Sequence, residues 1–218
     1  MFMQEFKVII FDFDGVILES EQIKDQGFEY IFRDYPQALG KIMEYHLANS
    51  AHTRFEKFQY ISEKILHITY TDELRQKYSR EFSRFVFEGV KNCPFVPGAR
   101  ELLEVYYPKF PLYVVSVTPE EDLTKIAQVR DLLKYFKKIY GTPWRKREAL
   151  KDILEREKIA PQDAVFIGDT FQDYKAAADT GISFIGRRNG KSFADCPAPL
   201  CDDLTGVRKI LDHGRVSG

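Results

Sequence analysis

The sequence has few cysteines and no long hydrophobic run, and both absences narrow the classes of protein to consider. Its three cysteines, Cys93, Cys196 and Cys201, lack the C-x-x-C spacing of a metal site, and an odd number argues against a closed disulfide framework. We therefore expect a reducing compartment. No stretch has the layout of a signal peptide or approaches the length needed to cross a bilayer. These absences predict a cytoplasmic protein with no membrane partner.

An excess of charge of either sign is absent as well. The 218 residues include 32 basic and 33 acidic side chains, for a net charge of -1. This balance gives no reason to expect a nucleic acid as partner, so any recognition of phosphate must be local. With 44% hydrophobic residues, the chain can bury the core of one large domain or of a domain with a substantial insert. We expect a monomer or a homodimer.

A short apolar run near the N-terminus leads into two acidic residues. The letters VIIF at 8–11 precede Asp12, and Asp14 and Gly15 follow. Such a run of β-branched and aromatic residues suits a central parallel strand covered on both faces. Two unpaired carboxylates would be costly to bury there. We therefore place them at a site at the strand's carboxyl end, where open α/β sheets bind their ligands.

The rest of the chain shows two kinds of pattern. Residues 16–92 carry four helical stripes and no convincing strand, which predicts an all-helical insert. Strands and helices alternate after Pro94, which argues for a doubly wound parallel sheet that also contains the first strand. We therefore predict an α/β, Rossmann-like core of residues 1–15 and 93–218, with a helical cap at 16–92 inserted after strand one. The strands expected after the cap are 112–116, 138–140, 164–168 and 182–185, and the helices are 99–107, 119–135, 146–157, 174–180 and 202–211.

Polar residues stand where three of these strands end. Asp12 and Asp14 follow the first strand, Ser116 ends the next, and Asp169 and Asp173 come after a third. Up to four carboxylates would therefore meet at one edge of the sheet, where like charges oppose one another's ionisation. A hard cation relieves this repulsion, and oxygen ligands suit Mg²⁺. The sequence predicts a magnesium site formed by the four aspartates.

Four motifs occur in an order that resembles the haloacid dehalogenase-like hydrolase superfamily. They are DFDGV at 12–16, Ser116, Lys146 and GDTFQD at 168–173. The insert after the first motif is similar to the helical cap of that superfamily, so the resemblance covers the whole chain. The true dehalogenases lack the second aspartate, here Asp14, and phosphatases and phosphomutases use it. Glu19 departs from many relatives, which have Asp before Ser at this place.

The resemblance implies a role for each residue of the site. Asp12 would be the nucleophile that forms an aspartyl-phosphate, and Asp14 would be the general acid and base. Mg²⁺ would be held by Asp12, the backbone carbonyl of Asp14, and Asp169. Asp173 would support the metal indirectly. Ser116 would donate a hydrogen bond to a phosphoryl oxygen.

The third motif is a single basic residue. Lys146 follows Gly-Thr-Pro, similar to the G-[ST]-P-x-x-K pattern of relatives, and would pair with the nucleophile and the phosphate. Arg145, Arg147 and Lys151 are the neighbouring alternatives.

Substrate binding is expected from both parts of the chain. Ser116, Thr118 and Lys146 form the expected set in the core. In the segment Ser50–Arg54 of the cap, Arg54 resembles the Arg in the specificity loop of sugar-phosphate relatives, and its planar donors suit a second anionic or hydroxyl-rich group. A solvated Arg in a helix-capping loop is the alternative interpretation.

These features predict a Mg²⁺-dependent phosphatase for a small phosphorylated metabolite, either a sugar phosphate or a phosphoglycolate-like compound. A phosphomutase is the alternative. β-Phosphoglucomutase carries a His in its first cap helix where this sequence has Lys24, which favours net hydrolysis. A non-catalytic binding protein on the same fold is a third hypothesis.

Overall fold

A computed structural model of the chain describes residues 6–49, 52–190, 193 and 196–213. The chain forms two compact units. The sheet unit comprises Met1–Glu19 and Pro94–Gly218, and the helical unit comprises Ser20–Cys93.

Among the described residues, the sheet unit is built on six parallel strands in the order β3-β2-β1-β4-β5-β6. Because β1 lies between β2 and β4, the strand order reverses beside it, and this is where doubly wound sheets bind ligands. The predicted parallel α/β sheet is confirmed. The strands are β1 (Val8–Phe11), β2 (Leu112–Pro119), β3 (Lys138–Thr142), β4 (Ala164–Gly168), β5 (Ser183–Arg187) and β6 (Leu200–Cys201).

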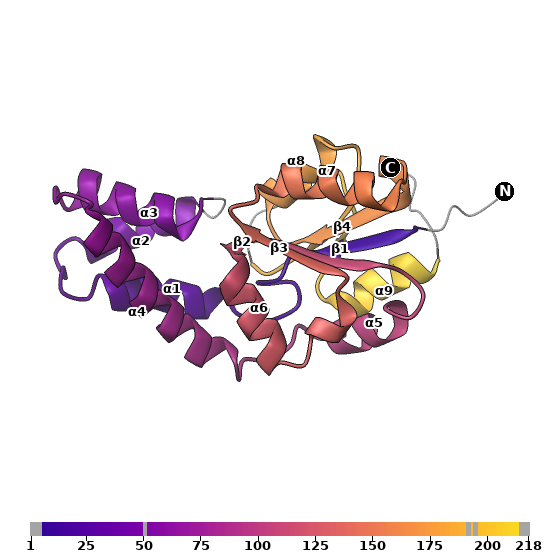
Figure 1. Cartoon of the computed structure of the whole chain (residues 1–218), viewed down its shortest axis with the longest axis horizontal. Helices are drawn as coiled ribbons and strands as arrows, with labels where there is room; N and C mark the ends of the chain where they lie inside the picture. Colours follow the sequence, from indigo (N-terminus) through magenta and orange to yellow (C-terminus); the bar gives the residue numbers. More distant parts are fainter. Residues whose placement is uncertain (1–5, 50–51, 191–192, 194–195, 214–218) are drawn as a thin grey trace. The chain divides into compact units, whose positions relative to one another are not determined.

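Helices cover both faces of this sheet (Figure 1), with α7 and α8 on one face and α5, α6 and α9 on the other. Alternate strand residues such as Ile10, Tyr113 and Phe166 pack in one buried cluster with Leu150 and Ile153 of α7. Period-two alternation thus assigns each strand side chain to one of two covered faces. The helices are α5 (Ala99–Tyr106), α6 (Glu120–Val129), α7 (Lys146–Glu157), α8 (Phe171–Ala178) and α9 (Leu204–Asp212), with short 3₁₀ helices η2 (Leu133–Tyr135) and η3 (Pro161–Asp163).

The helical unit packs around aromatic rings. Phe58 is fully buried, and its ring centroid lies 5.3 Å from Phe28, 5.5 Å from Tyr78 and 5.7 Å from Phe82. Three helices supply these rings, so the cluster joins them into one core. The elements are α1 (Glu21–Ile31), α2 (Leu39–Ala48), α3 (Arg54–Tyr60), the π-helix η1 (Ile61–Ile65) and α4 (Asp72–Val90).

The first segment of the sheet unit continues to Glu19, past the predicted boundary after residue 15. Here the chain leaving the sheet pairs with the chain returning to it. The Glu19 amide donates to the Pro94 carbonyl at 3.0 Å, and Leu18 forms an antiparallel bridge with Phe95. These backbone contacts place the outgoing segment and the returning segment in the sheet unit.

Several other elements differ from the expected ranges. Strands β2, β3 and β5 continue past their expected ends to Pro119, Thr142 and Arg187. The helix expected over 119–135 ends at Val129, since Asp131 adopts a left-handed φ of 55°. Helix α8 begins at Phe171, ahead of the expected residue 174, because Thr170 caps it. Strand β6 was not expected, since its two residues carry no periodicity.

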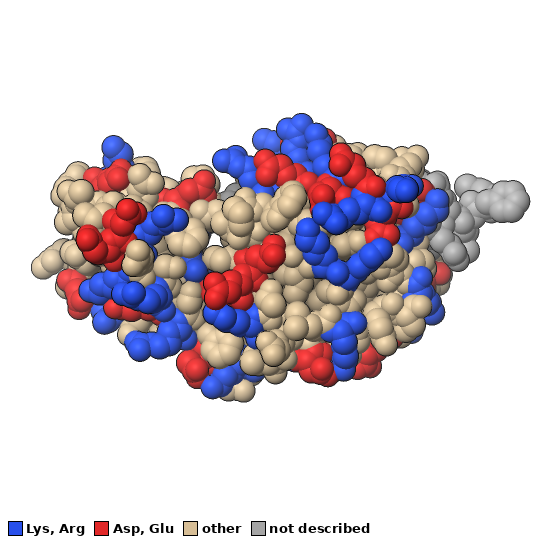
Figure 2. All heavy atoms as spheres, in the orientation of Figure 1, with Lys and Arg blue, Asp and Glu red and all other residues tan. Residues whose placement is uncertain are grey.

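No membrane-spanning helix is found in the part of the chain that the structure describes, since none combines the required length with sufficient apolarity. Acidic and basic side chains are interspersed on the face shown in Figure 2. This mixture agrees with the near-zero net charge.

We predict that Phe58→Ala destabilises the helical unit by about 3–5 kcal/mol, because it removes a ring at the centre of the aromatic cluster. Urea unfolding followed by circular dichroism would measure the loss. Leu47→Ala is the matched control, since Leu47 is 59% exposed and its truncation should change stability by less than about 0.5 kcal/mol. Equal losses for both variants would contradict the assignment of Phe58 to the core.

Candidate active site

The site begins where β1 ends. The Asp12 amide donates to the Ile167 carbonyl of β4 at 2.8 Å, so Asp12 is still held in register with the sheet. Its own carboxylate turns back to accept the Phe13 amide at 2.6 Å. The chain then turns at Gly15, which has a φ of 72° that other residues rarely adopt. The strand therefore delivers a buried carboxylate to the edge of the sheet.

Lys146 contacts this carboxylate from another element. As the first residue of α7, it donates from Nζ to Asp12 Oδ2 at 2.6 Å and also to Asp173 Oδ1. Its side chain is only 14% exposed, whereas Arg145 and Arg147 are exposed. Of the basic residues considered for the third motif, the structure thus brings Lys146 to the nucleophile candidate.

Asp169 comes from the turn between β4 and α8, and Asp173 comes from the first turn of α8. Thr170 caps α8, and its amide and hydroxyl donate to Asp173 Oδ2 at 3.1 and 2.6 Å. Gly168 fits here because a Cβ at this position would overlap the Asp173 side chain. Helix capping therefore holds Asp173 with its other oxygen turned to Lys146.

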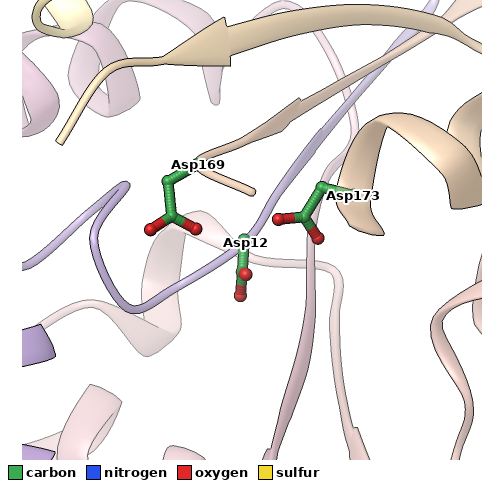
Figure 3. Close-up of side chains that lie close together, drawn as sticks. All are labelled: Asp12, Asp169 and Asp173. Atoms are coloured by element: carbon green, nitrogen blue, oxygen red, sulfur yellow. The ribbon is translucent and has the colours of Figure 1, made fainter. Parts of the chain in front are cut away.

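Three carboxylates meet at this edge. Asp12, Asp169 and Asp173 are buried, and one oxygen of each lies within 4.8 Å of the others. Figure 3 shows the three side chains close together, with Asp12 between Asp169 and Asp173. When ionised, three negative charges against the one positive charge of Lys146 leave -2, so a divalent cation fits the charge and the oxygen donors.

Burial and the charge of the ion-pair partner have opposite effects on the pKa values of Asp12 and Lys146. Burial raises the pKa of Asp12 to about 6, the positive charge of Lys146 opposes the rise, and the charges of Asp173 and Asp14 add to it. Burial alone would lower the pKa of Lys146, but the carboxylates of Asp12 and Asp173 outweigh it and raise that pKa. Lys146 is therefore a stable cation. It lies beside Asp12, whose ionised form is disfavoured by burial.

The second aspartate has a different environment. Asp14 Oδ2 accepts a hydrogen bond from the Thr118 hydroxyl at 3.0 Å. Ser116 is buried within β2, which continues past it to Pro119, and its Oγ accepts the Thr118 amide at 3.2 Å. Thr118, expected to bind substrate, thus directs its hydroxyl to Asp14. Ser116 was expected at the strand end, but the strand continues beyond it to Pro119.

Arg54 begins α3 in the helical unit. Its Nη2 donates to Ser79 Oγ at 3.2 Å, and its guanidinium carbon lies 5.0 Å from the ring centre of Phe55. Thr53 caps the helix in a reciprocal box with Glu56, as the helix-capping interpretation expects, whereas Arg54 itself is half-buried and not fully solvated. Ser50 and Ala51 lie outside the described residues. The role of Arg54 in substrate binding stays a prediction.

The sequence reasoning missed Arg187, the last residue of β5, and Asn189, which follows the strand. Arg187 donates to both oxygens of Glu19, at 3.0 and 2.6 Å, and to the Gly15 carbonyl at 3.1 Å. Asn189 donates to Asp169 Oδ2. The available signal was their position directly after a predicted buried strand, at the edge of the sheet where the other polar residues lie.

Comparisons with known proteins agree with this geometry. The family model for haloacid dehalogenase-like hydrolase matches residues 9–187. A phosphoglycolate phosphatase from Vibrio vulnificus is 26% identical over 231 residues, covering 100% of both chains. A 5'-nucleotidase from Pseudomonas aeruginosa is 29% identical over 140 residues, covering 59% of this chain and 63% of the nucleotidase. The match thus spans less than two thirds of the nucleotidase.

A solved structure shares the fold. A HAD-hydrolase from Bacillus subtilis, bound to magnesium, superposes with a TM-score of 0.75 at 18% identity, covering 95% of this chain and 99% of the other. The family match runs from within β1 to the end of β5 and includes every carboxylate described above. The chain therefore belongs to the haloacid dehalogenase-like hydrolase family and is an enzyme of that family.

Proposed function

We propose that this enzyme is a magnesium-dependent phosphatase that hydrolyses a small phosphomonoester through an aspartyl-phosphate on Asp12. The observation that carries the proposal is the meeting of Asp12, Lys146 and two further buried carboxylates at the sheet edge. The names of the Vibrio phosphatase and the Pseudomonas nucleotidase support phosphate-ester hydrolysis. The magnesium in the Bacillus structure supports the choice of metal.

The metal would be held by Asp12, Asp169 and the backbone carbonyl of Asp14, with Asp173 supporting it indirectly. When bound, Mg²⁺ supplies positive charge that offsets the charge on the phosphoryl oxygens. Lys146 contributes a second positive charge from the protein itself. Its ammonium favours the ionised form of Asp12, which is the form that can attack phosphorus.

Asp14 would transfer the protons. It protonates the leaving oxygen as Asp12 attacks in line, and it then takes a proton from the water that hydrolyses the aspartyl-phosphate. The Thr118 hydroxyl orients the Asp14 carboxylate by the 3.0 Å hydrogen bond. Ser116 of β2 is proposed to donate to a phosphoryl oxygen. Each step therefore has a residue at the carboxyl edge of the sheet.

The relatives and Arg54 of the helical unit support a proposal for the substrate class. A phosphoglycolate-like acid or a sugar phosphate has an anionic or hydroxyl-rich group beyond its phosphate, and the planar donors of Arg54 suit such a group. We propose that Arg54 contacts this part of the substrate and that it selects among phosphomonoesters.

We predict that the enzyme releases inorganic phosphate from members of a panel of sugar phosphates, 2-phosphoglycolate and nucleoside monophosphates, and that a chelator abolishes the release. Added Mg²⁺ should restore it, because the metal offsets charge that the protein alone leaves uncompensated. A colorimetric phosphate assay measures both results. Full turnover in excess chelator would contradict the metal requirement. Conversion of a hexose phosphate into its positional isomer would favour a phosphomutase.

Substitutions of Asp12 and of Asp14 are predicted to impair the reaction in different ways. Asp12→Asn should form no covalent intermediate, whereas Asp14→Asn should slow turnover by about 10²–10⁴-fold, because it removes only proton transfer. Rapid quenching of the Asp14→Asn variant with labelled substrate should trap phosphate on Asp12. Label on another residue, or wild-type turnover by Asp12→Asn, would show that the roles are wrongly assigned.

We predict that Lys146→Met raises the pKa of Asp12 in the metal-free protein above its value of about 6. The reason is that both the charge and the hydrogen bond of Lys146 favour the ionised carboxylate. Carbon-13 NMR titration would follow the carboxyl signal that Asp12→Asn removes. Lys125→Met is the control, since the exposed Lys125 pairs with Glu121 instead. An unchanged titration midpoint in Lys146→Met would contradict the predicted coupling.

A further inference from the structure

The end of β5 forms an additional side of the proposed metal site. Gly186 of β5 lies in parallel register with Gly168 of β4, so the segment that follows β5 runs beside the turn that contains Asp169. Asn189 lies three positions past Gly186 on this segment. Its side-chain amide donates to Asp169 Oδ2. This contact joins a residue outside the four family motifs to one of the proposed metal ligands.

Gly15 leaves the space that this contact occupies. A Cβ built on Gly15 would lie 3.0 Å from Asn189 Nδ2 and closer still to Asp169 Oδ2. The amide and the carboxylate therefore pack directly against the backbone of the first motif. Any side chain at position 15 would displace the pair, in addition to the strain that its φ of 72° would cause.

Arg187 fixes the surrounding backbone. It is buried, with 7% exposure, and its guanidinium donates to the Gly15 carbonyl at 3.1 Å and to the Asp202 carbonyl at 3.2 Å. The same side chain holds both oxygens of Glu19. Since Arg187 belongs to β5, it ties the strand end from which Asn189 extends to the backbone on which the pair rests.

We infer that Asn189 is a positioning residue for Asp169, which it holds in the orientation that binds the metal. The inference rests on the magnesium site of the proposed function. A neutral amide suits this role because it restricts rotation of the carboxylate without cancelling its charge. Lys146 behaves differently toward Asp12 and Asp173, since it brings a full positive charge to both.

The inference predicts a weaker metal site in Asn189→Ala. Calorimetric titration of the resting enzyme with Mg²⁺ should show an affinity about 10–100-fold lower than that of the wild type, the usual effect of removing a hydrogen bond to a metal ligand. The Mg²⁺ concentration that gives half-maximal phosphate release should rise by the same factor. Turnover at saturating Mg²⁺ should return close to the wild-type rate, because no reacting group is removed.

Two further variants sharpen the test. Asn189→Leu is similar in size and has no donor, so it should weaken Mg²⁺ binding even where a water could replace the amide in the alanine variant. Asn92→Ala removes an exposed amide from the helical unit and should leave the affinity unchanged. Thermal unfolding of all three would check that the variants are folded.

The outcomes separate this inference from the proposed function. If the wild type binds Mg²⁺ and both Asn189 variants bind it equally well, the positioning role is wrong and the magnesium site stands. If the wild type binds no Mg²⁺, the proposed metal site fails and the inference fails with it. A lower maximal rate with unchanged Mg²⁺ affinity would also overturn the inference, since it would indicate a different role for Asn189.

Discussion

The buried ammonium of Lys146 is the contact on which the arrangement of the site depends. It binds carboxylates from two different elements, Asp12 after β1 and Asp173 in the first turn of α8. Removing one partner of a buried ion pair leaves an uncompensated charge, at a cost of about 3–5 kcal/mol. The starts of α7 and α8 and the end of β1 are therefore held together by electrostatics as well as by the packing of the sheet.

Folding and electrostatics are coupled through Asp173 in particular. One of its oxygens completes the cap of α8 with Thr170, and the other accepts from Lys146. The residue that completes the cap of a helix thus also contacts the cation beside the nucleophile candidate. A parallel sheet allows one residue to serve both purposes, because each strand ends at the same edge and each following turn can place a polar group there.

The sequence predicted those parts of the molecule that show hydrophobic periodicity or belong to a motif of fixed spacing. The buried strands, the helical stripes and the residues Asp12, Lys146 and Asp169 were all found in this way. Residues whose role comes only from tertiary placement were missed. Asn189 lies on an irregular segment after β5, and only the register of β5 with β4 brings it to Asp169. Nor could periodicity show that Thr118 directs its hydroxyl to Asp14.

The bridge between Leu18 and Phe95 has a consequence for how such enzymes diversify. The chain leaves the sheet and returns to it at adjacent positions, so the ends of the insert are already closed by the sheet unit. Because loop-closure entropy grows only slowly with length, an insert of another size would cost the sheet unit little. Evolution could therefore exchange the segment between these two residues while the register of β1 and the residues at its end are inherited unchanged.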